Sequence, residues 1–150
     1  MARWRLQPGF SVIEFMILVA LLCVVAAIGV PNFIEMQYRA QRAEVPANLA
    51  GIHVAALAYQ TVNGEVVPAR VPWPDATPDS RPRPWKRGSN FDALGWRPEG
   101  DVRGSYMLEA TSQGTFHVKG MCDVDGNGVQ AQFITDMDGT VNILTGSEVY

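Results

Sequence analysis

The sequence is poor in cysteine, in net positive charge and in recognisable catalytic motifs. Only two cysteines occur among its 150 residues, Cys23 and Cys122. They lie far apart in the chain, so a disulfide-rich scaffold is excluded and no intrachain disulfide is expected. The formal net charge of −3 argues against a nucleic-acid binder that relies on overall charge. We find no glycine-rich phosphate loop, serine nucleophile motif or His/Cys metal cluster, and we therefore do not expect an enzyme.

Polar residues are nearly absent from positions 10–30, where Ser11 and Glu14 alone interrupt an apolar run. As a helix this run would be about 31 Å long, which matches a bilayer core of about 30 Å. A cleaved secretory signal is the competing interpretation, but the run continues into a helical pattern without a small-residue cleavage site. Arg3 and Arg5 precede the run and no acid does, so the positive-inside rule predicts a cytoplasmic N-terminus and one pass through the inner membrane.

Glu14 stands out because it lies four residues into the apolar run. A carboxylate inside a membrane segment is costly, and such residues usually serve a function. One interpretation is a partner with positive charge. The other is a carboxylate close enough to the interface to stay solvated.

The beginning of the chain has an ordered series of features. A short basic leader ends at Gly9, Phe10 follows, Glu14 comes four residues later, and an apolar helix carries Pro31 near its end. This series resembles the type IV prepilin family, and the resemblance extends over about the first 64 residues. It implies an α+β, pilin-like fold, in which a long and partly transmembrane N-terminal helix packs on an antiparallel β-meander of about four strands.

The resemblance also implies how the chain would be processed. A membrane-embedded prepilin peptidase would cut between Gly9 and Phe10 and then N-methylate Phe10. Glu14 of one subunit would pair with the new amino group of a neighbour, which neutralises a buried acid with an opposite charge. Pro31 lies where pilin helices are irregular and can extend during assembly.

The function implied is that of a major or minor pilin in a type IV pilus or pilus-like filament. Its partners would be identical or other pilins, the prepilin peptidase, the inner-membrane assembly platform and membrane lipid. The chain would lie in the inner membrane before assembly and in an extracellular or periplasmic filament afterwards. The alternatives are a pseudopilin of a type II secretion system and a non-polymerising, membrane-anchored module that binds DNA or calcium. Glu14 argues against the last, since a simple anchor has no use for it.

Five segments are predicted along the chain: the leader 1–9, the transmembrane half-helix 10–31, the amphipathic half-helix 32–63, a Pro/Trp-rich connection 64–103 and the sheet 104–150. Pro46 is expected to kink the helix or to start a new one near Ala47. His53 is expected at the boundary or surface of the helix. The apolar stripe that should face the sheet consists of Val45, Leu49, Ile52, Ala56 and Tyr59.

The connection holds seven of the ten prolines, which excludes long helices and central strands there. Its tryptophans should pin it to the rest of the fold. A basic cluster surrounds Trp85, and basic side chains with an aromatic ring can bind nucleic acid. DNA is nevertheless not an expected partner, because a solvated loop or a contact with the acidic C-terminal part of a neighbour explains the charges equally well. The cluster comprises Arg81, Arg83, Lys86 and Arg87.

Alternating patterns predict strands at 106–109, 116–119, 129–133 and 140–144. The turn before the third strand, Asp123–Gly128, fits the first half of a calcium loop, but its twelfth position is Ile134 instead of glutamate, which excludes an EF-hand. We favour a plain hairpin turn. The alternative is a weak calcium site formed by Asp123, Asp125 and Asn127 with Asp136 or Asp138.

Overall fold

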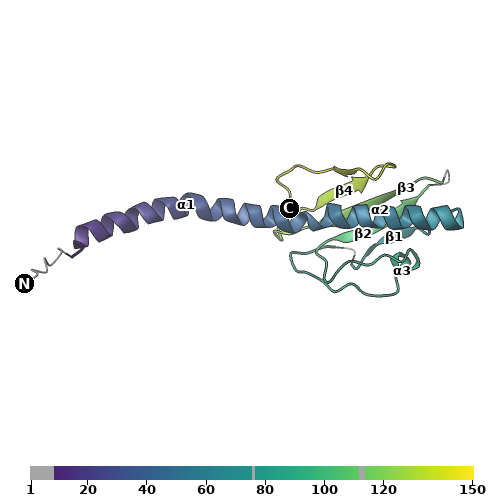
Figure 1. Ribbon diagram of the computed structural model, residues 1–150, viewed down its shortest axis with the longest axis horizontal. Coiled ribbons are helices and arrows are strands. Elements are labelled where there is room, and N and C mark those ends of the chain that lie inside the picture. The colour runs from purple at the N-terminus through teal and green to yellow at the C-terminus, as the bar shows by residue number, and fades with distance from the viewer. Residues whose placement is uncertain (1–8, 76, 112–113) are drawn as a thin grey trace, which may run out of the picture. The chain divides into compact units, whose positions relative to one another are not determined.

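The computed structural model describes residues 9–75, 77–111 and 114–150 (Figure 1). The leader residues Arg3 and Arg5 lie outside these ranges. The chain divides into two compact units, Met1–Gln37 and Tyr38–Tyr150. The first consists of most of helix α1 (Val12–Arg42), and the second contains everything that follows.

Helix α1 runs through Pro31 without a break and is followed, after Ala43 alone, by α2 (Glu44–Asn63). Ala43 keeps right-handed helical angles, with φ −62° and ψ −14°. The interruption therefore lies three residues before Pro46, and the predicted kink or restart at Pro46 was misplaced. Proline is tolerated in the first turn of a helix, and its missing N–H cannot bond the carbonyl of Arg42, which ends the preceding helix. Helix α2 ends where predicted, at Gly64 with φ 84°.

The sheet has five antiparallel strands in the order β1-β2-β3-β4-β5. The prediction of an α+β fold is confirmed. The sheet has one strand more than predicted, because the proline-rich connection forms β1. Proline is accepted there because β1 is an edge strand. The same connection forms the short helix α3 (Asn90–Ala93). The strands are β1 (Ala69–Trp73), β2 (Ser105–Ala110), β3 (Phe116–Cys122), β4 (Ala131–Thr135) and β5 (Val141–Ile143).

The core lies between α2 and the sheet. Val45 and Leu49, from the predicted stripe, are fully buried against β3. A Cβ on Gly120 would lie 2.7 Å from Cγ1 of Val45, so only glycine allows this close approach of strand and helix. Trp85 and Trp96 pack on Tyr106 of β2, with ring centroids 6.2 and 6.1 Å away, which confirms that tryptophans pin the connection to the rest of the fold.

Two expectations about single side chains were wrong. His53 is buried, with 5% of its surface exposed, because Phe116 and the β4–β5 turn at Gly139 cover its ring. Burial lowers the pKa of His53, and the nearby charge of Asp138 opposes that shift. Val129 was expected to begin the third predicted strand, but it is exposed and precedes β4.

Candidate functional site

The first candidate site is the apolar surface of α1. No residue of α1 is buried, and side chains such as Val12, Ile13 and Leu22 are more than half exposed. Within the described ranges, one helix is long and apolar enough to cross a membrane, judged by its length and composition, and it lies near the N-terminus. Such a surface requires lipid or other apolar helices around it.

Glu14 is held at the start of this helix by a contact within its own chain. The backbone N–H of Ser11 donates to Oε2 of Glu14 at 2.7 Å, and the N–H of Phe15 donates to the carbonyl of Ser11. Ser11 and Glu14 thus form one half of a capping box, in which the carboxylate also lies at the positive end of the helix dipole. The contact was not predicted, although the Ser-x-x-Glu spacing is the sequence signal for it.

The expected processing site precedes the helix. Gly9 and Phe10 have no helical or strand structure and are exposed, and 71% of the Phe10 surface is accessible. A bond in exposed, irregular backbone can enter a protease site. The carboxylate of Glu14 accepts the N–H of Ser11, the residue directly after Phe10. It is therefore close to the nitrogen of Phe10, where cleavage would create an amino group.

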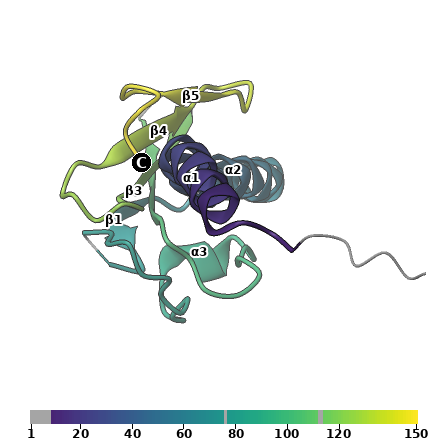
Figure 2. The same cartoon turned by 90° about the vertical axis from the view of Figure 1, so that its left-hand side faces the viewer.

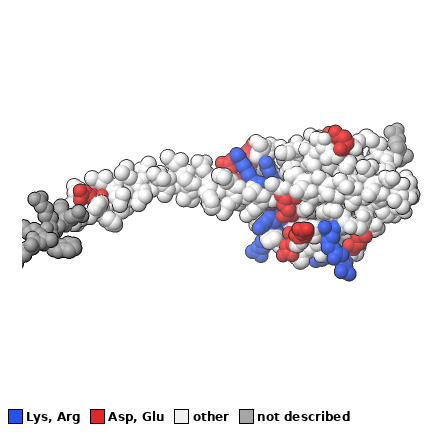
Figure 3. Space-filling model, viewed as in Figure 1, with Lys and Arg blue, Asp and Glu red and all other residues white. Residues whose placement is uncertain are grey.

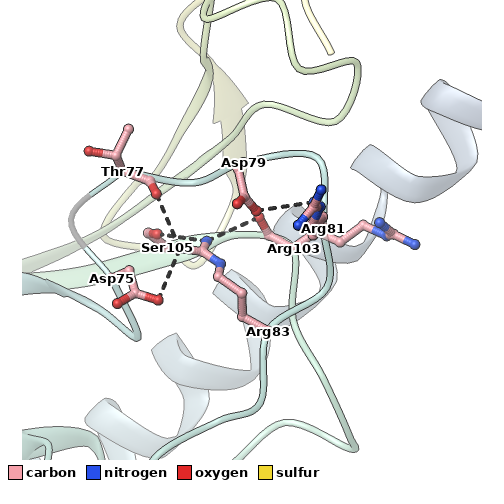
Figure 4. Close-up of polar contacts among 7 residues, drawn as sticks. All are labelled: Asp75, Thr77, Asp79, Arg81, Arg83, Arg103 and Ser105. Carbon is pink, nitrogen blue, oxygen red and sulfur yellow. Dashed lines mark hydrogen bonds and ion pairs between the residues drawn. The ribbon is translucent and has the colours of Figure 1, made fainter.

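The basic cluster predicted around Trp85 is divided by the fold (Figure 4). Arg83 is largely buried and forms an ion pair with Asp75 at 3.3 Å. It also donates to the carbonyl of Thr77 and to Oγ of Ser105, both at 3.2 Å. Arg81, Lys86 and Arg87 remain exposed. Arg83 therefore holds the connection to β2 and is not available to a ligand.

Replacing Arg83 with methionine should lower the free energy of unfolding by about 2–3 kcal/mol, because several hydrogen bonds from a charged group are lost. The exposed Arg81→Met is the matched control and should change it by less than about 0.5 kcal/mol. Chemical unfolding of the detergent-solubilised full chain, followed by tryptophan fluorescence, measures both. Equal stability of the two variants would contradict a structural role for Arg83.

The acidic loop after β3 is closed by its own hydrogen bonds. Asp123 is 5% exposed, and its two carboxylate oxygens accept the N–H groups of Gly126 and Gly128 at 2.8 and 2.9 Å. In the next turn, Asp136 accepts from Asn142, and Asp138 accepts from the N–H of Thr140.

The loop residues Asp125 and Asn127 likewise accept bonds from the local backbone. Among the described residues, no group of three or more His, Cys, Asp or Glu side chains is arranged to hold a metal ion. This geometry supports the interpretation as a turn, and the calcium site remains a prediction from the sequence alone.

Asp123→Ala should lower the free energy of unfolding by about 3 kcal/mol, because it removes two charge-assisted hydrogen bonds in a buried loop. Asp123→Asn keeps one acceptor oxygen and should lose roughly half as much. Thermal unfolding of the full chain in detergent, with and without calcium, measures both effects. A rise in Tm with calcium that Asp125→Ala abolishes would instead establish the weak calcium site.

The two cysteines are both free thiols in very different surroundings. Cys122 is buried in β3, and this burial raises the pKa of its thiol to about 12. Such a thiol is inert at neutral pH. Cys23 is exposed on α1 within the apolar run.

Comparison with known proteins finds one informative similarity. The chain is 45% identical over 47 residues to the type IV major pilin protein PilA of Myxococcus xanthus (strain DK1622). The matched stretch covers 31% of this chain and 21% of the relative, so the chain spans about a fifth of the length of the curated relative it matches. This similarity supports a relationship to type IV pilins. No protein-family model matches the chain, and no solved structure matches it.

Proposed function

We propose that the chain is a structural subunit of a type IV pilus or pilus-like filament. The observation that carries the proposal is an N-terminal helix whose apolar side chains are exposed along its length and whose first turn holds a single carboxylate, Glu14. A surface of this kind suits a helix that first lies in a membrane and later packs among identical helices. The similarity to a major pilin points in the same direction.

The first step of the proposed pathway is cleavage between Gly9 and Phe10 by a prepilin peptidase, followed by N-methylation of Phe10. The exposed, irregular backbone at these residues suits a protease substrate. The chain is then the substrate of a reaction and not a catalyst.

In the second step, Glu14 selects the position of the neighbouring subunit. Its carboxylate already accepts the N–H of Ser11, which lowers the cost of holding it at the membrane surface. A positively charged N-terminus on a neighbour would compensate the remaining charge. An unpaired carboxylate among apolar helices would oppose any other stagger.

The proposal includes a location and a set of partners. Before assembly, the chain is a single-pass inner-membrane protein with a cytoplasmic N-terminus, where it contacts lipid, the prepilin peptidase and the assembly platform. After assembly it belongs to an extracellular or periplasmic filament with identical or other pilins. A pseudopilin of a type II secretion system is the second candidate, and the same α1 surface favours it equally.

Immunogold electron microscopy with an antibody against the globular unit tests the proposal. Filaments on cells of the native host should be labelled, and labelling should disappear when the gene is deleted. Detection of the chain only in inner-membrane fractions, beside unlabelled filaments, would overturn the proposal of a pilus subunit. Loss of protein secretion in the deletion strain, without loss of surface filaments, would favour the pseudopilin.

A further inference from the structure

The sheet of the globular unit has two open edges, β1 and β5. Figure 2 shows β5 on one side of this unit and β1, with α3 near it, on the opposite side. Open edges are usually covered or charged in proteins that stay monomeric, because they invite association. The side chains at these two edges carry charges of opposite sign.

We define the basic edge by Arg70 and Val71 of β1 together with Lys86 and Arg87 of the adjoining loop. All four are exposed, and Nε1 of Trp73 donates to the carbonyl of Lys86 at 3.0 Å, which fixes this loop beside β1. In the described part of the chain, the three cationic groups form no ion pair.

A cavity of about 290 Å³ opens at the basic edge, lined by Arg70, Val71, Trp73 and residues 88–91, where the loop leads into α3. Asp92 is the acid near this loop. Its carboxylate accepts the N–H of Gly88 at 2.6 Å and lies 3.9 Å from Arg97. Arg97 therefore partly offsets the charge of Asp92, and the cations of the basic edge remain in excess.

We define the acidic edge by Asp136, Met137, Asp138, Ile143 and Leu144 of the β4–β5 hairpin. All five are exposed, and Met137 and Leu144 expose 63% and 58% of their surfaces. In the space-filling view, blue side chains lie over the part of the unit that carries α3, with red side chains among them (Figure 3). The residues that define each edge thus combine exposed apolar side chains with charges that can meet the opposite charges of the other edge.

We propose that the acidic edge of one copy of this chain docks on the basic edge of the next copy. This inference rests on the proposed function, since it places the contact inside the filament. Two unlike edges on opposite sides of one unit make a heterologous contact, which repeats from subunit to subunit without closing and so builds a helical array. Opposite charges select this pairing, because two like edges would repel each other. The exposed apolar side chains of the hairpin face the cavity and Val71 of the neighbour.

The charge pairing can be tested in the full chain expressed in its host, first by reversing one charge and then by exchanging the charges of the two edges. Arg87→Glu should reduce the yield of sheared filaments about tenfold, equivalent to about 1.4 kcal/mol per contact. The double variant Arg87→Glu/Asp138→Arg should restore the yield to within about twofold of the unaltered chain. Arg81→Glu, which makes the same change of charge away from the basic edge, is the matched control and should leave the yield unchanged.

Cysteine cross-linking tests the same contact without altering its charges. In a Cys23→Ser background, filaments with both Val71→Cys and Leu144→Cys should give a ladder of oligomers after mild oxidation. Either substitution alone should give none, because a heterologous contact never brings identical residues together.

The outcomes separate the inference from the proposed function. If the unaltered chain is absent from filaments, the proposed function fails. If filaments contain the chain, yet Arg87→Glu has no effect and no ladder forms, the docking of the two edges is overturned while the filament subunit stands. Reduced DNA binding by Arg87→Glu, without rescue by Asp138→Arg, would assign the basic edge to nucleic acid and would also overturn the docking.

Discussion

Cells that carry Glu14→Ala should lose at least about nine-tenths of their filaments and still hold the chain in the inner membrane in normal amounts. A neutral side chain enters the bilayer more easily than a carboxylate, so insertion should not suffer. Assembly should fail because the amino group of Phe10 on the neighbouring subunit loses its counter-charge. Filament counts by electron microscopy and immunoblots of membrane fractions measure the two quantities side by side.

A second substitution separates the two roles of Glu14. Glutamine can still accept the N–H of Ser11, as it does in natural capping boxes, but it carries no charge. If charge pairing drives assembly, Glu14→Gln should fail as severely as Glu14→Ala. Normal filaments with Glu14→Gln would contradict the pairing and would reduce Glu14 to a helix cap, worth about 0.5–2 kcal/mol.

Gly9→Leu should accumulate unprocessed precursor in the inner membrane, with a loss of mature chain of more than about tenfold, which corresponds to about 1.4 kcal/mol in the barrier to cleavage. Glycine has no side chain, so it lets extended backbone enter a narrow protease site, whereas leucine adds four carbon atoms at the scissile bond. Gly9→Ala is the graded control and should be cut at an intermediate rate. Pulse labelling, with precursor and mature chain resolved by mass, checks this. Processing of Gly9→Leu at the normal rate would contradict a cut at this bond.

Local sequence patterns were sufficient to predict most of the fold. The stripe from Val45 to Ala56 is buried as predicted, because helical spacing places those residues on one face. The alternating residues of β2 and β3, such as Tyr106 and Val118, are buried for the corresponding reason. The strand β1 was missed, because its proline is acceptable only at a sheet edge, and edge position is a property of the whole topology.

Burial that depends on distant segments could not be predicted. His53 is covered by Phe116 and by the turn at Gly139, both far from it in the sequence. Arg83 looked like one member of a basic cluster, yet Asp75 and Ser105 hold it inside the fold. Spacing along the chain gives the charge of a segment but not the direction in which each side chain points.

The candidate site is predicted from local spacing, whereas the interior depends on segments that are distant in the sequence. Gly9, Phe10 and Glu14 are recognised by their spacing alone, because the peptidase and the neighbouring subunit would act on a linear segment. The contact between Ser11 and Glu14 was missed, although its spacing is equally local. The edge-to-edge contact could be inferred only after the structure had placed β1 and β5 at opposite ends of the sheet order.

The mass of the chain in purified filaments tests the central claim most directly. Filaments sheared from the native host, dissolved and measured as intact protein, should contain a chain that begins at Phe10 and carries one N-methyl group. That result would show that the same molecule has been cleaved, methylated and assembled into a filament. A filament preparation without this chain, or one in which the chain still retains residues 1–9, would contradict the account.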